Sequence, residues 1–329
     1  MKRIKMLLVL LLLSSCTSLT IKSLDILSND IVQDKDQFLK NILYAYSLIE
    51  TIDKKYGYTL VPYKYKDTLF FNYKKKDSKN VLVYVHGGAF YIRTVNSFYY
   101  TMNEKILENC PKDYEIILLD YKGLKYPEQN KELENVLDYV QKRYDRIVLM
   151  GDSSGGNLIL SQVLKRRDEH KKLPDGLVLL SPWTDLTNTV KSRKDNFTKD
   201  VLFGKTYPKL LLNNPYIEDV KDKTNPYISP VYGDYHNFPK TLIQCGSTEL
   251  LLDDSRIVYE NMKENKVDAK LEIYDNMVHV FQLFGIFDRT DEALKNVSKF
   301  LGGIYKLSLI HIWRCRRRRE CRSRWSPYH

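Results

Sequence analysis

A serine, a histidine and several carboxylates stand at spacings that suit nucleophilic catalysis. Residues 151–156 read Gly-Asp-Ser-Ser-Gly-Gly and follow a short apolar run at 146–150. A strand, then Gly-x-Ser-x-Gly, then a helix is the pattern of a nucleophile presented at the tip of a sharp turn. Glycine two residues before and two residues after leaves room for a serine in strained backbone. The pattern predicts that Ser153 is a catalytic nucleophile.

A glycine-containing loop upstream could stabilise the negative charge that such a reaction develops. An apolar, strand-like run at 81–85 ends in His-Gly-Gly-Ala-Phe at 86–90. A His-Gly-Gly loop in this position commonly supplies the N–H donors of an oxyanion hole. Glycine lets the backbone approach the charge without an intervening side chain. We predict that the N–H groups of Gly87, Gly88 and Ser154 form the donor set.

The general base is found by elimination among the six histidines. His279 follows a strand-like run and a turn, and it comes last in the order serine, acid, histidine. Glu249 is the first carboxylate after the preceding strand, and it would orient the imidazole and stabilise the imidazolium. Asp253 competes for this role, although it would lie in the first turn of a helix, where acidic side chains suit the helix dipole.

Together these motifs resemble the hormone-sensitive-lipase-like family of α/β-hydrolases over about residues 60–300. The matching stretches are 86–88, 120–122, 151–156, 181–186, 225–230, 246–254 and 279–281. The resemblance implies hydrolysis of carboxylic esters through an acyl-enzyme, without a metal or cofactor. Ala89 replaces the third glycine of the usual loop, which would tighten the acyl pocket. Ser154 stands where alanine is usual, and Glu249 where most members carry aspartate, although some branches use glutamate.

The elements that would position these residues can also be read from the chain. Strand-like runs lie at 59–65, 68–73, 81–85, 114–119, 146–150, 176–181, 240–245 and 271–275. Helix-compatible segments lie at 98–109, 129–143, 156–168, 254–264 and 288–304. From the third strand onward the two types alternate, which predicts an α/β-hydrolase fold with a mostly parallel eight-stranded sheet and helices on both faces. The predicted catalytic residues all follow strand ends, where open sheets place their sites.

Two stretches do not belong to this alternation. Residues 30–57 have helical apolar spacing, which an ordinary packed helix would also show, and residues 187–224 are polar with scattered apolar positions. The family resemblance implies that such segments join into a small helical cap, which would limit acyl-chain size and exclude water. We therefore expect a hydrolase domain at 59–306 with a cap insertion at about 187–224, preceded by a tether and cap helix at 16–58.

Residues 1–15 predict a lipoprotein signal peptide. A basic start is followed by an eight-residue apolar run that is too short to span a bilayer. The sequence Leu-Ser-Ser-Cys that ends at Cys16 matches the bacterial lipobox, in which this cysteine becomes the lipidated first residue. The protein would then be anchored in the cell membrane through lipid, on the extracytoplasmic side. The alternative is a plain secretory signal with an incidental cysteine.

The C-terminal segment changes how the charge is interpreted. Residues 307–329 resemble a translated sequencing adapter and are set aside from the fold; the alternative is an Arg-rich binding tail. The formal charge of the chain is +11, but this segment carries +6 and residues 1–15 carry +3, which leaves +2 for residues 16–306. The charge therefore predicts no nucleic-acid partner. Outside the lipobox and this segment only Cys110 and Cys245 remain, which argues against a disulfide framework.

The predicted function is that of a serine carboxylesterase acting on small-molecule, short-chain esters, with no cofactor and no metal. The nearest alternative is an amide hydrolase, formamidase-like or peptidase-like, that uses the same triad. A non-catalytic surface lipoprotein on a hydrolase scaffold is the alternative from another class. That alternative predicts a broken triad or loop, whereas every element is present in this chain.

Overall fold

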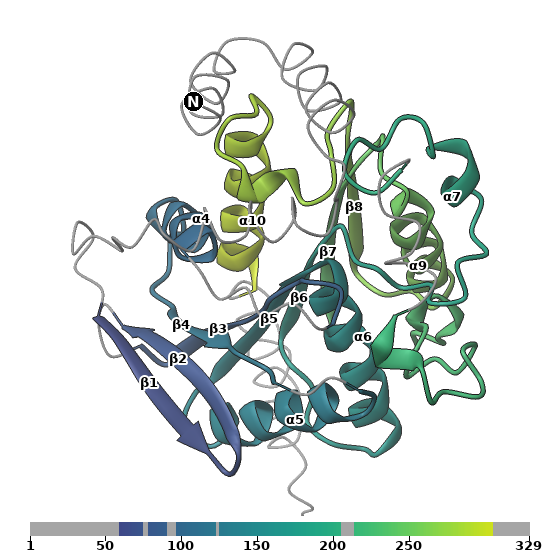
Figure 1. Cartoon of the computed structure of the whole chain (residues 1–329). Coiled ribbons are helices and arrows are strands. Elements are labelled where there is room, and N and C mark those ends of the chain that lie inside the picture. Colours follow the sequence, from purple (N-terminus) through teal and green to yellow (C-terminus); the bar gives the residue numbers. More distant parts are fainter. Residues whose placement is uncertain (1–58, 75–77, 91–96, 123–124, 205–213, 305–329) are drawn as a thin grey trace, which may run out of the picture.

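The centre of the computed structural model, which describes residues 59–74, 78–90, 97–122, 125–204 and 214–304, is an eight-stranded sheet (Figure 1). The strand order is β1-β2-β4-β3-β5-β6-β7-β8. The strands are β1 (Thr59–Tyr65), β2 (Thr68–Lys74), β3 (Asn80–Val85), β4 (Glu115–Leu119), β5 (Arg146–Asp152), β6 (Gly176–Leu180), β7 (Lys240–Gly246) and β8 (Ala269–Tyr274). β2 pairs antiparallel with β1 and β4, and every other pair is parallel. The predicted mostly parallel sheet is confirmed.

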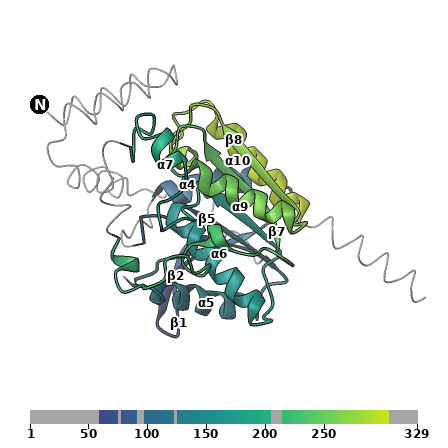
Figure 2. The ribbon, with the colours of Figure 1, turned by 90° about the vertical axis from the view of Figure 1, so that its right-hand side faces the viewer.

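Helices cover both faces of this sheet, as predicted. The five long ones are α4 (Ser97–Glu108), α5 (Glu128–Val140), α6 (Ser153–Asp168), α9 (Leu252–Glu264) and α10 (Thr290–Gly303). Figure 1 shows α4 and α10 together on one face, and α5, α6 and α9 on the other. Figure 2 shows β8 beside α9 and α10 at one end of the sheet, and the β1–β2 hairpin beside α5 at the other.

The side-chain alternation of β3 shows how one strand serves both layers. Val81, Val83 and Val85 face the layer of α5, α6 and α9, whereas Leu82 and Tyr84 face the layer of α4 and α10. Successive side chains of a strand point to opposite faces, so a strand buried on both faces reads as an uninterrupted apolar run. This is why the central strands were recognisable from the sequence.

The apolar spacing of a helix likewise shows which of its sides is buried. In α5, Leu133, Val136, Leu137 and Val140 are all buried, and their spacing of three, one and three places them along one stripe of the helix. Helix α6 begins at Ser153 and not at the predicted residue 156, because the serine turn leads directly into the helix.

The cap prediction lies partly outside the described residues. Within 187–224, the structure describes residues 187–204 and 214–224, which contain the short helices α7 (Ser192–Asp195) and η2 (Pro215–Ile217). A helical cap therefore stays a prediction. Residues 1–58, including Cys16, and residues 305–329 also lie outside the described part. Within the described part, no helix has the length and apolar character needed to cross a membrane.

Candidate active site

Ser153 lies at the tip of a sharp turn between β5 and α6. Its φ angle is +50°, in the left-handed region that non-glycine residues rarely adopt. The backbone of β3 passes so close that a Cβ atom on Gly155 would lie 2.0 Å from the Val85 carbonyl oxygen, and one on Gly151 would lie 2.7 Å from it. Both glycines of the Gly-x-Ser-x-Gly pattern are thus required by close packing on β3.

The sheet register brings the other predicted residues to the same edge. Val85 pairs with Gly151, and Gly246 pairs with Tyr274, across parallel neighbours. The loops that follow β3, β5, β7 and β8 therefore leave the sheet at the same edge, with β6 between β5 and β7. This edge is the carboxyl end of the parallel strands, where open α/β sheets bind their ligands.

Glu249 and His279 form a buried hydrogen-bonded pair. Glu249 Oε2 lies 2.9 Å from His279 Nδ1, and the two residues are 0% and 5% exposed. Burial raises the pKa of the Glu249 carboxyl, whereas its hydrogen bonds and the nearby His279 oppose the rise. An ionised carboxylate only accepts hydrogen bonds, so the imidazole proton faces it on Nδ1 and leaves Nε2 as an acceptor.

Asp253, the competing acid, is engaged elsewhere. It lies in the first turn of α9, where its carboxylate accepts a hydrogen bond from the Ser192 N–H at 2.7 Å and pairs with Arg256. The carboxylate that the structure places on the imidazole is that of Glu249.

Ser181 joins the acid to the histidine loop, a role for which the sequence had offered no assignment. Its hydroxyl donates to Glu249 Oε1 at 2.7 Å and accepts from the Val280 N–H at 3.1 Å. Val280 has a φ of +49°, a strained conformation for a β-branched residue. The sequence signal for Ser181 is the motif at 181–186, which belongs to the family resemblance.

The oxyanion loop requires one correction. The Gly87 N–H donates to Asp152 Oδ1 at 2.9 Å, so it is not available to an oxyanion. A Cβ atom on Gly87 would lie 2.2 Å from Asp152 Oδ2, which shows how tightly the loop packs on the residue before the nucleophile. In the same loop, the N–H groups of Gly88 and Ala89 donate to no described residue. Ser154 N–H is at the first turn of α6, where backbone donors lack intrahelical partners.

The same loop is braced from several sides. The Phe90 N–H donates to Ser154 Oγ at 3.1 Å, so the serine that replaces the usual alanine ties the loop to the helix. The Tyr121 hydroxyl donates to the His86 and Gly87 carbonyls at 3.0 and 3.3 Å, and its ring stacks on His86. His86 therefore belongs to the support of the loop.

The sequence of this chain matches a known protein family. A family model described as "alpha/beta hydrolase fold" matches residues 82–283. This chain belongs to that α/β-hydrolase family. An "Esterase" from Acinetobacter venetianus is 28% identical over 227 residues, 67% of this chain and 74% of that protein. An "Acetyl esterase" from Salmonella schwarzengrund is 23% identical over 238 residues, 68% and 72% of the two chains.

Solved structures of the family show the same architecture. A crystal structure titled as an esterase from the bacterial hormone-sensitive lipase family is 25% identical, with a TM-score of 0.74. The match covers 87% of this chain and 97% of the solved chain. The predicted α/β-hydrolase fold is thereby confirmed.

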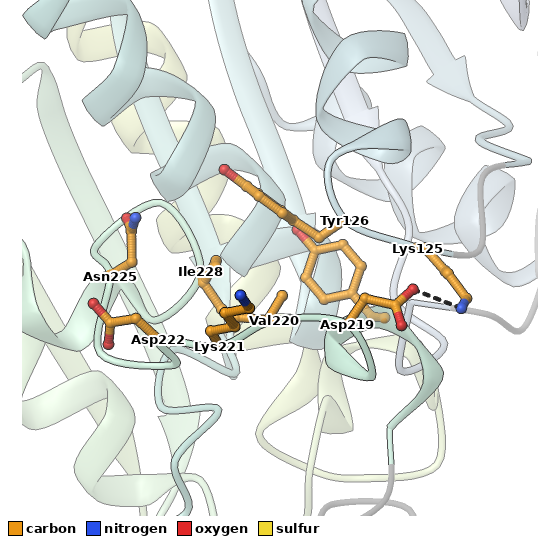
Figure 3. Close-up of a pocket in the computed structure, with 9 residues that line it drawn as sticks. Lys125, Tyr126, Asp219, Val220, Lys221, Asp222, Asn225 and Ile228 are labelled. Atoms are coloured by element: carbon orange, nitrogen blue, oxygen red, sulfur yellow. Dashed lines mark hydrogen bonds and ion pairs between the residues drawn. The ribbon is translucent and has the colours of Figure 1, made fainter.

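This α/β-hydrolase also has a hollow of about 270 Å³ (Figure 3). Tyr126, Tyr216 and Ile228 contribute its apolar wall, and an ion pair of 2.7 Å between Lys125 and Asp219 lies at its side. None of the predicted catalytic residues lines it. Among the described residues, no group of three or more His, Cys, Asp or Glu is placed to hold a metal ion.

Proposed function

We propose that this protein is a serine carboxylesterase that hydrolyses small or short-chain carboxylic esters through an acyl-enzyme. The observation that carries the proposal is the buried pair of Glu249 and His279 at the sheet edge where the strained Ser153 turn lies. Ester hydrolysis is the activity in the names of the two relatives. One of them is named for acetyl esters, which supports a short acyl group.

In the first half of the reaction, Ser153 Oγ attacks the ester carbonyl carbon while His279 Nε2 takes the hydroxyl proton. In this structure the two side chains are not hydrogen-bonded to each other, and such contacts often tighten only when substrate binds. The carbonyl oxygen becomes an oxyanion, held by the N–H groups of Gly88, Ala89 and Ser154. The imidazolium then protonates the leaving alkoxide, the ester C–O bond breaks, and the acyl group stays on Ser153.

In the second half, water replaces the alcohol. His279 takes a proton from water, whose oxygen attacks the acyl carbon, and the same donors hold the second oxyanion. Collapse of this intermediate returns the proton to Ser153 Oγ and releases the acid. Throughout, Glu249 holds the ring in one tautomer and stabilises its positive charge.

The test is hydrolysis of p-nitrophenyl esters, from acetate to dodecanoate, by the full chain and by two variants. We expect wild-type activity to be highest for the short acyl chains. Ser153→Ala should lower kcat by about 10⁶-fold, since the nucleophile is lost. Ser154→Ala, the matched control, keeps its backbone donor and loses the side-chain hydrogen bonds to the Phe90 N–H and to Tyr121, so kcat should fall by less than about tenfold. A folded wild type without Ser153-dependent hydrolysis would contradict the proposal.

We also propose that the protein is anchored in the cell membrane, on its extracytoplasmic side, through lipid on Cys16. The support is the lipobox sequence after a basic and apolar start. In a bacterial host that processes lipoproteins, the wild type should sediment with membranes and Cys16→Ala should not. Equal membrane association of the two would rule out the lipid anchor.

A further inference from the structure

Part of the predicted cap insertion is hydrogen-bonded to the backbone of the triad acid. The Asn196 side-chain amide donates to the Glu249 carbonyl at 2.8 Å and to the Ser247 carbonyl at 3.1 Å. One Asp200 carboxylate oxygen accepts the Leu250 N–H at 2.7 Å. The insertion therefore engages both the carbonyl and the N–H of the Glu249–Leu250 peptide group, and also the Ser247 carbonyl two residues before Glu249.

The next peptide group is held from the same segment. The Leu250 carbonyl accepts hydrogen bonds from the Ser192 hydroxyl at 2.7 Å and from the Arg193 guanidinium at 2.6 Å. Arg193 is itself fixed, because it forms a buried ion pair with Asp254 in α9. The loop that carries Glu249 is thus held at several backbone groups, which limits how far it can move.

Asp200 links this anchor to the histidine. Its second oxygen accepts the N–H groups of Leu202 and Phe203, both at 2.9 Å, which closes a tight turn. The turn presents the Phe203 ring edge-on to the His279 imidazole, with ring centres 4.6 Å apart and an interplanar angle of 62°. One buried carboxylate therefore ties together the acid loop and the aromatic ring that contacts the base.

The Asp200 carboxylate is 4% exposed, and burying a charge is costly unless hydrogen bonds compensate it. Burial raises the pKa of its carboxyl, and the three N–H donors and the nearby His279 ring act against this rise. A carboxylate that accepts three backbone N–H groups from two separate loops holds those loops in a fixed relative position.

We propose that residues 192–203, which we call the acid-loop clamp, position the catalytic pair: Asn196 and Asp200 hold Glu249 through its backbone, and Phe203 holds the imidazole. This inference rests on the proposed esterase function. Asp200 does not contact the reacting atoms, so it is a positioning residue that acts through Glu249 and His279.

The experiment is a double-mutant cycle of Asp200→Asn with Glu249→Ala, measured as ester hydrolysis by the full chain. Asparagine replaces one acceptor oxygen by an N–H₂ donor, which must face either Leu250 N–H or the turn. Misplacing the pair should lower kcat by about 10²-fold, while KM should change by less than about threefold because no substrate contact is lost. In the Glu249→Ala background the acid that Asp200 positions is gone and only its effect on the imidazole through Phe203 remains, so Asp200→Asn should lower kcat by less than about tenfold.

The matched control is Asp195→Asn, the same chemical change in the same segment. Asp195 is exposed and pairs only with the exposed Lys191 among the described residues, so kcat should stay within about twofold of wild type. If Asp200→Asn fails to fold by circular dichroism, Asn196→Ala replaces it in the same cycle. That variant deletes the donor to the Glu249 carbonyl.

Two results would overturn the clamp: wild-type kcat in the clamp variant, or the same proportional loss with and without Glu249. A purely structural role predicts the second result, because a general loss of order does not depend on the acid. These failures differ from failure of the proposed function. Absence of Ser153-dependent hydrolysis in the wild type would contradict the esterase proposal and the clamp together.

Discussion

The hydroxyl of Ser181 is shared by the acid and by the loop of the base, so one small side chain sets the relative position of two residues that do chemistry. It donates to Glu249 and accepts from the Val280 N–H. Both hydrogen bonds are buried. Leaving a buried donor without a partner lowers the free energy of unfolding by about 1–3 kcal/mol. A strained Val280 also needs surrounding contacts that hold it in place.

Ser181→Ala should therefore weaken both catalysis and stability. We expect kcat to fall by about tenfold, because Glu249 loses one of its fixing donors, and the free energy of unfolding to fall by about 1–3 kcal/mol. Ser298→Ala is the control, since the Ser298 hydroxyl is equally buried but donates to the Ile106 and Leu294 carbonyls in the α4–α10 layer. It should lose stability and keep kcat. An equal loss of kcat in both variants would contradict the role given to Ser181.

At the scale of elements, the site depends on how closely β5, α6 and β3 approach one another. The Ser153 turn can be sharp only if the helix starts against the β3 backbone, and glycines make that contact possible. The oxyanion loop, which continues β3, is tied to the same turn through Asp152 and Ser154. Strand, turn and loop therefore form one packed unit.

Gly155→Ala should disrupt that unit. Its Cβ would lie 2.0 Å from the Val85 oxygen and 2.6 Å from the His86 oxygen, both backbone atoms that cannot move independently. We expect a loss of more than about 3 kcal/mol in the free energy of unfolding, measured in urea, and loss of activity. Gly303→Ala, at the end of α10, has nothing within 4 Å of the added atom and should change stability by no more than about 1 kcal/mol. A stable, active Gly155→Ala variant would show that the turn can relax.

At the scale of the whole molecule, the sheet separates two apolar layers and collects buried carboxylates at its carboxyl edge. Burial raises the pKa of each of them: Asp152, Asp200, Glu249 and Asp254. Each accepts hydrogen bonds from loops that the sheet brings together. The folded state thus holds ionised groups that the unfolded chain would solvate better, and its stability must depend on pH.

Asp152 allows this dependence to be tested. Burial raises the pKa of its carboxyl from 3.8 to about 6, against the lowering effect of the Tyr84 hydroxyl and the Gly87 N–H. Because the folded state binds this proton more tightly, the group stabilises the fold below pH 3.8, and that contribution is lost as the pH rises through about 6. The free energy of unfolding of wild type minus that of Asp152→Asn should fall by about 2–3 kcal/mol between pH 4 and 7, measured by urea unfolding. A difference that does not change with pH would contradict the raised pKa.

Much of this molecule follows from local sequence. Apolar runs that lie in the sheet centre are continuous, so β3, β5, β6 and β7 could be recognised with boundaries within one or two residues. The Gly-x-Ser-x-Gly turn is one contiguous motif, and the acid and the base follow it in a fixed order along the chain. Both features can be found in a single sequence. Fold class and the candidate residues Ser153 and His279 are therefore properties that one sequence can determine.

Contacts between distant segments were decided only by the tertiary structure. The sequence left Glu249 and Asp253 as competing acids, and the turn into α9 placed one on the imidazole and the other on Ser192. It predicted Gly87 as an oxyanion donor, but the approach of β3 to β5 commits that N–H to Asp152. No local pattern marks Asp200 as a partner of residues fifty positions away. Hydrogen bonds between loops depend on where the sheet delivers each loop, and that is set by packing of the whole chain.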